Sequence, residues 1–135
     1  GILSSLSRKA ELIENAEGAA ERITRTGEPG ETYDSYGPAR VLGRIYFKLP
    51  GFAGGSNSKS IEYLKIAYEN GSEFAMNVWY YAEVLAAGST SQKNEAKRIL
   101  DKLLSHDPET YNEARVVETR VEFEEAKKLR RQLGN

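Results

Sequence analysis

The chain has 135 residues, of which 39% are hydrophobic and 29% are charged, and its formal net charge is -1. This length and composition indicate one globular domain with a buried core rather than a disordered chain. The near-zero charge argues against a general nucleic-acid-binding protein, whose domain would be markedly basic, and a chain without cysteine forms no disulfide.

The first half of the sequence predicts three amphipathic helices. Apolar residues recur at spacings of three and four over residues 2–26, with charge on the opposite face. That charged face includes Arg8, Glu11 and Glu14. The same periodicity predicts a helix over residues 36–48, which Pro50 ends, and another over residues 58–71.

The second half predicts three further helices. Ser72 can cap a helix over residues 73–87. A polar turn over residues 89–94 then precedes a helix that ends at residue 104. Asp107 caps a last helix, with Pro108 at its first position. This helix is expected to run without a break to about residue 133. No stretch alternates with a period of two, so the sequence predicts an all-α protein of about six helices.

Two segments of the sequence share one pattern of apolar and small residues. The first reads Ala39-x-x-Leu42-Gly43-x-x-Tyr46, followed by Ser60-x-x-x-Leu64-x-x-Ala67. The second reads Val78-x-x-Tyr81-Ala82-x-x-Leu85, followed by Ala96-x-x-x-Leu100-x-x-Leu103. Gly43 and Ala82 are 39 positions apart, and self-similarity at such a period is typical of stacked helical hairpins.

The repeat pattern defines an organisation within a single domain, residues 1–135. Residues 1–30 form an N-terminal capping helix, and residues 33–71 form the first hairpin. Residues 72–106 form the second hairpin, and residues 107–135 form a C-terminal capping helix. Arrays of this kind usually bind other molecules rather than catalyse reactions.

The two hairpins resemble degenerate tetratricopeptide repeats. In that family a small residue of the first helix lets the partner helix approach closely, and Gly43 and Ala82 take that position. The run from Gly43 to Ser56, with Leu49-Pro50-x-x-x-Gly54-Gly55 as its most specific part, looks like the T component of TRAP transporters. The similarity covers roughly residues 37–133. Proteins of that family are bacterial helical-repeat lipoproteins of the periplasm, associated with tripartite solute uptake systems.

This resemblance implies a non-enzymatic binding module without a cofactor. Its concave groove would hold a protein partner, such as a solute-binding protein, or a small organic anion. The alternative is a cytoplasmic scaffold that binds acidic peptide tails. Membrane association is expected only through a lipid anchor, whose cysteine this sequence does not contain, and homo-oligomerisation stays open. Gly1 stands where Met would start a full-length chain, so a trimmed or processed form is expected.

The family's groove positions supply the candidate ligand- or partner-binding residues. These are Arg40, Arg44 and Lys48 in the first hairpin, Trp79 and Glu83 in the second, and Arg115, in a looser register, in the last helix. The first three share one helix face because they are spaced at four. Arginine beside an aromatic ring suits a carboxylate-bearing ligand. The competing interpretation is a row of ordinary solvated cations, with Trp79 partly in the core.

Other residues that could carry chemistry are assigned structural roles. The segment from Gly51 to Ser56 lacks the Gly-Lys-Ser/Thr ending of a phosphate loop, so we expect a specially bent turn with Phe52 as a packing anchor or a contact. His106 is the only histidine, and no zinc site is expected. The carboxylates of the last helix are assigned to a solvated face; they are Glu122, Glu124 and Glu125.

Overall fold

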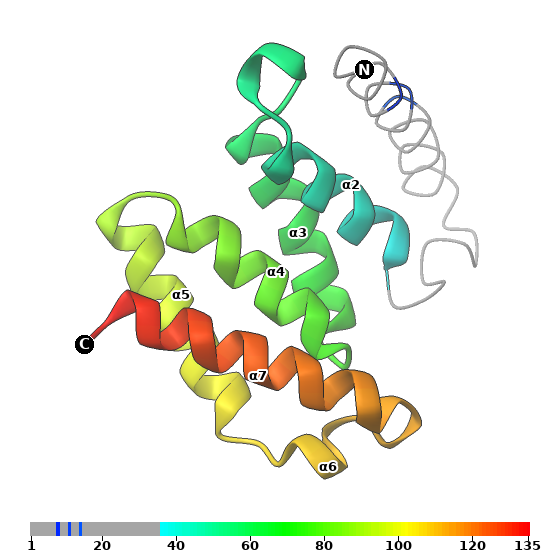
Figure 1. Cartoon of the computed structure of the whole chain (residues 1–135), viewed down its shortest axis with the longest axis vertical. Coiled ribbons are helices and arrows are strands. Elements are labelled where there is room, and N and C mark those ends of the chain that lie inside the picture. Colours follow the sequence, from blue (N-terminus) through cyan, green and yellow to red (C-terminus); the bar gives the residue numbers. More distant parts are fainter. Residues whose placement is uncertain (1–7, 9–10, 12–13, 15–35) are drawn as a thin grey trace. The chain divides into compact units, whose positions relative to one another are not determined.

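The structure is a computed structural model, and it describes Arg8, Glu11, Glu14 and residues 36–135. Within these residues the regular elements are all helices, which confirms the predicted all-α class (Figure 1). The elements in order are α2 (Gly37–Lys48), the 3-10 helix η1 (Gly51–Ala53), α3 (Asn57–Gly71), α4 (Ala75–Ala86), α5 (Thr90–Leu104), α6 (Pro108–Tyr111), the 3-10 helix η2 (Glu113–Arg115) and α7 (Val116–Leu133). The helix predicted over residues 2–26 lies outside the described residues, except that Arg8, Glu11 and Glu14 are helical and exposed.

The chain divides into two compact units, Gly1–Asn70 and Gly71–Asn135. The first unit contains α2, η1 and nearly all of α3, and the second contains α4 to α7.

Close contact between α2 and α3 defines the first unit. A Cβ atom added to Gly43 would lie 2.5 Å from Cγ of Leu64, so no larger residue fits there without a shift. The hydroxyl of Ser60, which is fully buried, donates a hydrogen bond of 2.7 Å to the Gly43 carbonyl oxygen. The rings of Tyr46 and Tyr63 stack with their centroids 5.9 Å apart. The small residue at position 43 therefore permits the close helix approach that the sequence predicts.

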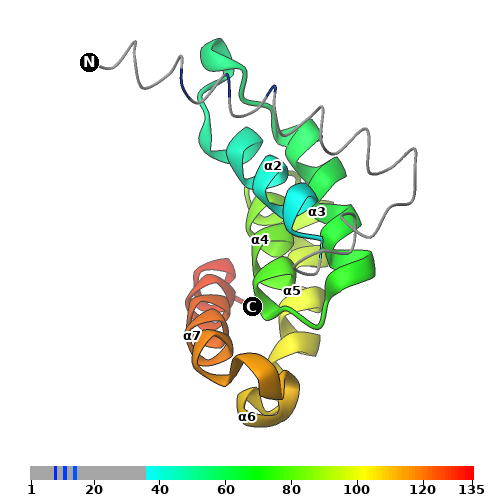
Figure 2. The same ribbon diagram turned by 90° about the vertical axis from the view of Figure 1, so that its right-hand side faces the viewer.

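The loop between α2 and α3 is specially bent and braced. Its backbone forms hydrogen bonds from Gly55 N–H to the Pro50 oxygen (2.9 Å) and from Ser56 N–H to the Tyr46 oxygen (3.0 Å). Gly54 has φ 98°, and a Cβ atom on Gly55 would lie 1.8 Å from the Leu49 oxygen. The two glycines are therefore required by the geometry. The loop projects beyond the ends of both helices (Figures 1 and 2).

In the second unit α4, α5 and α7 pack on one another, and α6 packs on α7 (Figures 1 and 2). The buried side chains include Val84 and Leu85 from α4, Ile99 and Leu100 from α5, and Phe123 from α7. Helix α5 begins earlier than predicted. Ser89 and Gln92 form a capping box, so the segment predicted as a polar turn is the first turn of the helix.

The prediction of one unbroken C-terminal helix is wrong. Asp107 caps the first turn as expected, but Asn112 is extended, with φ -149° and ψ 94°, and separates α6 from η2 and α7. The Asn112 amide donates a hydrogen bond of 2.9 Å to the Glu73 oxygen, and the hydroxyl of Tyr111 donates one to the Ser72 oxygen. Bonds to a segment 39 residues away stabilise this break, so no local pattern of turn residues marks it.

The close approach at Gly43 predicts the effect of adding one methyl group. Gly43→Ala should lower the free energy of unfolding by up to about 2 kcal/mol, because overpacking against Leu64 costs about 1–3 kcal/mol and helix propensity returns about 1 kcal/mol. Urea unfolding followed by circular dichroism measures this loss.

Gly51→Ala is the matched control, since a Cβ atom there would have no neighbour within 4 Å. Its stability should stay within about 0.5 kcal/mol of the wild-type value. A Gly43→Ala protein about 1 kcal/mol more stable than the wild type, as helix propensity alone would give, would show that α2 and α3 do not pack as described.

Candidate functional site

The three predicted cations of the first hairpin lie on α2, and we call Arg40, Arg44 and Lys48 the basic row. Their spacing of four within one continuous helix places them on one face, as predicted. Exposure rises along the row: Arg40 is buried, Arg44 is half-buried and Lys48 is exposed. The end of the row that is open to a ligand is therefore the end that meets the loop.

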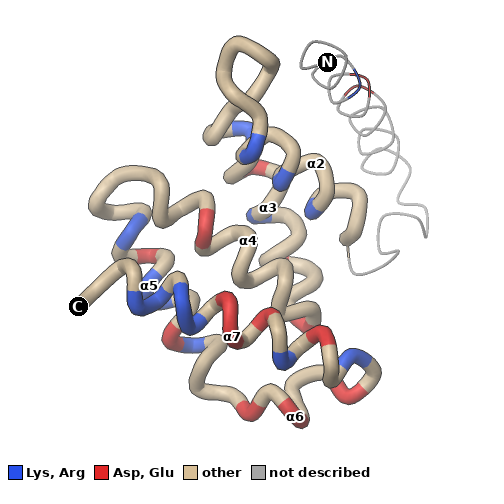
Figure 3. The backbone as a smooth tube through the Cα atoms, viewed as in Figure 1, with Lys and Arg blue, Asp and Glu red and all other residues tan. Residues whose placement is uncertain are grey.

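The surroundings of the basic row combine positive charge with an apolar surface. From Tyr36 to Ile61 the sequence has four cations and no acidic residue (Figure 3). Val41 is 51% exposed and lies one turn from Arg44 and two turns from Lys48. This face can therefore offer charge to a carboxylate and an apolar contact to the carbon skeleton that bears it.

The second group of predicted residues belongs to the other unit. Trp79 and Glu83 are half-buried and lie one turn apart on α4. The Trp79 ring lies 4.9 Å from the ring of Tyr80, its neighbour in sequence. The structure thus brings together the basic row in one unit, and Trp79 with Glu83 in the other.

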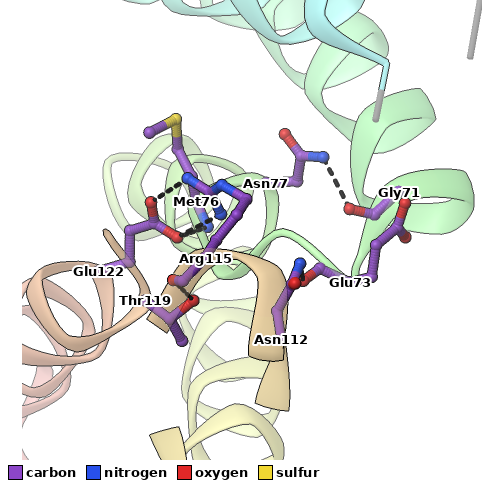
Figure 4. A network of polar contacts seen from close by, with 8 residues as sticks. All are labelled: Gly71, Glu73, Met76, Asn77, Asn112, Arg115, Thr119 and Glu122. Carbon is purple, nitrogen blue, oxygen red and sulfur yellow. Dashed lines mark hydrogen bonds and ion pairs between the residues drawn. The ribbon is translucent and has the colours of Figure 1, made fainter. Parts of the chain in front are cut away.

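Arg115 is held by its own chain. Its guanidinium donates two hydrogen bonds to the Glu122 carboxylate, of 3.2 and 2.8 Å, and lies over the Phe74 ring, 4.0 Å from the centroid (Figure 4). A bidentate pair of this kind is among the stronger side-chain interactions. Arg115 therefore has a structural role, and its assignment to ligand binding stays a prediction.

Glu122 is the residue that organises this contact. Its side chain is 3% exposed, and its Oε1 also accepts a hydrogen bond of 3.1 Å from the Met76 N–H in the first turn of α4. Phe74, at the start of that helix, provides no side-chain cap, so the expectation that Ser72 caps it is wrong. A carboxylate from α7 performs this function instead, where it also meets the positive end of the helix dipole.

Further hydrogen bonds extend the contact to the segment that precedes α4 (Figure 4). The Asn77 amide donates a bond of 2.7 Å to the Gly71 oxygen, and the Thr119 hydroxyl donates one of 2.6 Å to the Arg115 oxygen. Asn77 and Thr119 are both fully buried. Within the part of the chain that the structure describes, every buried side-chain nitrogen and oxygen has a hydrogen-bond partner.

The assignment of Glu122 to a solvated face is wrong, whereas Glu124 and Glu125 do pair with the nearby Lys127 and Lys128 at the surface. The sequence contains the signal for this difference. Glu122 lies three residues after Thr119 and four before Ala126, both of which are buried. That spacing places its side chain on the buried stripe of α7.

Phe52, in η1, is 86% exposed, so it is not a packing anchor for its own chain. The second interpretation, a contact for another molecule, stays a prediction. The exposure of this large apolar side chain could not be read from the sequence, where a phenylalanine between Gly51 and Ala53 is equally compatible with burial.

Other ionisable groups of the described residues form structural or surface contacts. His106 Nδ1 donates a hydrogen bond of 2.9 Å to the Lys102 oxygen at the end of α5. Arg98 donates to Glu95 and lowers the pKa of that carboxyl by this hydrogen bond. No group of three or more His, Cys, Asp or Glu residues gathers as a metal site among the described residues. No helix there is long and apolar enough to cross a bilayer.

Comparison with known proteins identifies no family for this chain. A scan against protein-family models finds no match, and a search of curated proteins finds none. The resemblance to the T component of TRAP transporters therefore rests on the sequence motifs alone.

The buried position of Glu122 predicts a large effect of removing its charge. Glu122→Gln should lower the free energy of unfolding by about 2–4 kcal/mol, because the mostly buried Arg115 then lacks its counter-charge. Trp79 is the only tryptophan and lies on α4, so its fluorescence during urea unfolding reports on this unit.

Glu109→Gln is the control, since it removes the charge of an exposed pair, in which Arg120 and Glu109 are 57% and 49% exposed. Pairs of this type contribute about 0–1 kcal/mol. Equal losses in the two variants would contradict the structural role assigned to Glu122.

Proposed function

We propose that this chain is a non-enzymatic binding module similar to the T component of TRAP transporters, which recognises a partner protein or a small organic anion. The observation that carries the proposal is the basic row on α2, in a stretch with four cations and no acidic residue. The ligand would therefore bear one or more carboxylates.

The geometry of the first unit supports the repeat interpretation. The close approach of α2 and α3 at Gly43 is what a small residue at that position of a tetratricopeptide hairpin provides. In such an array the first helix of each pair lines the concave face, and α2 and α4 take that place in the motif. Trp79 and Glu83, on α4, are therefore the contribution of the second unit to the proposed binding residues.

Arg44 and Lys48 are the residues to which we assign anion recognition. An arginine guanidinium can bind a carboxylate with two parallel hydrogen bonds, and a lysine contributes a point charge. Arg40 is 7% exposed, so its guanidinium is assigned to support of the helix face rather than to first contact with a ligand. The exposed Val41 gives the ligand an apolar contact beside these charges.

The compartment follows from the resemblance and is proposed to be the periplasm, with a lipid anchor supplied from outside this sequence. The alternative is a cytoplasmic scaffold for acidic peptide tails, which would use the same cations. The start of the full-length gene separates the two: an export signal followed by a cysteine favours the periplasmic module, and its absence favours the scaffold.

Binding of an acidic ligand tests the proposal. The probes are a fluorescein-labelled peptide that ends in several glutamates with a free carboxylate, and a panel of small dicarboxylic acids as competitors. Arg44→Gln combined with Lys48→Gln should weaken binding by about tenfold or more at low salt, because each lost charge-assisted hydrogen bond is worth about 1.5–3 kcal/mol. Fluorescence anisotropy measures the affinity, and Trp79 emission reports whether the ligand also affects α4.

Lys93→Gln combined with Lys102→Gln is the matched control, since it removes the same charge from exposed positions of α5. This variant should bind like the wild type. Equal weakening of binding in both variants would show that the affinity depends on the net charge of the protein and not on the basic row. No binding of any probe would refute anion recognition by the basic row.

A further inference from the structure

A loop held by its own backbone presents an apolar side chain between two helix ends that each carry a lysine. We define the loop surface as Phe52, Lys48 and Lys59. Phe52 is 86% exposed at the projecting loop, and both lysines are exposed, one at the end of α2 and one in the first turn of α3. The loop is held by its own backbone hydrogen bonds, so little conformational entropy would be lost when Phe52 docks on another surface.

Helix α7 presents the complementary combination. We define the α7 surface as Val117, Val121 and Glu118. The two valines are 67% and 59% exposed and lie one turn apart, and Glu118 is exposed beside them. From Ser105 to Glu122 the sequence has five acidic residues and two cations (Figure 3). Arg115 is paired with Glu122, and Arg120 is paired with Glu109.

We propose that this protein self-associates head to tail, with the loop surface of one copy docked on the α7 surface of a second copy. Phe52 would pack on the two valines, while Lys48 and Lys59 would face Glu118 and its acidic neighbours. Complementary potentials of this kind select partner and orientation. The proposal goes beyond the proposed function and does not require an anionic ligand.

Charge favours this pairing over the other occupants of the same surfaces. A two-fold contact of the loop surface with itself would bring lysines together, and one of the α7 surface with itself would bring carboxylates together. An anionic membrane could attract the lysines, but a single inserted phenylalanine provides a small apolar area for anchoring, and a membrane leaves the α7 surface unexplained. The apolar contact is also small for a protein interface, so the association is weak and concentration-dependent.

Sedimentation velocity from about 10 µM to about 1 mM protein tests the proposal. The wild-type weight-average mass should rise with concentration. Phe52→Gln and Val121→Gln should each weaken association by about tenfold or more, since each removes one half of the apolar contact. Both positions are exposed, so both variants should keep the wild-type circular dichroism spectrum.

Mixing the two variants gives the decisive result. The Val121→Gln copy keeps an intact loop surface and the Phe52→Gln copy keeps an intact α7 surface, so the mixture should form a 1:1 dimer that extends no further. Phe52→Leu, which stays apolar, and Val41→Gln, at another exposed valine, should associate like the wild type. A wild type that stays monomeric at all concentrations, or variants that do not complement each other, would overturn the proposal.

Discussion

The absence of a side chain at Gly43 is the constraint on which the first unit depends. Because Leu64 occupies the space that a Cβ atom would need, the close packing of α2 on α3 requires glycine at this position. Leu42 and Tyr46 are buried together with that face. The 3.6-residue period then directs Arg44 and Lys48 toward another side of the helix. The placement of the basic row thus depends on how closely two helices pack.

In the second unit the packing of α4 on α7 depends on a buried carboxylate, that of Glu122. The first turn of α4 has no local cap, and its Met76 N–H is satisfied by Glu122, 46 residues later in the sequence. Arg115 neutralises that carboxylate and in turn covers the Phe74 ring. A buried ion pair adds little net stability compared with a well-packed apolar alternative. Its effect here is to fix the start of α4 relative to α7 within this unit.

The sequence predicted what local patterns determine. Helices α2 to α4 follow from apolar periodicity together with stop residues such as Pro50, and the shared face of the basic row follows from its spacing. The break at Asn112 depends on a hydrogen bond to a residue 39 positions away, which no local window contains. The spacing of Glu122 from Thr119 and Ala126 marks its buried position, but its partner Met76 lies 46 positions away and no local pattern identifies it. Burial of Arg40 and exposure of Phe52 likewise depend on packing rather than on residue type. The sequence therefore predicted which residues of the candidate site share a helix face, but not which of their side chains are exposed to a ligand.

The exposed end of the basic row and the loop surface share Lys48, and this has a thermodynamic consequence for the two proposals. A carboxylate ligand bound at Arg44 and Lys48 would neutralise charge that also attracts the acidic α7 surface of a second copy. Coupling between two binding equilibria is reciprocal. If the ligand weakens self-association by a given factor, self-association therefore weakens the affinity for the ligand by the same factor. An anion that bound at this face would thus favour the monomer. Assembly and ligand recognition would then be alternative uses of one charged helix end.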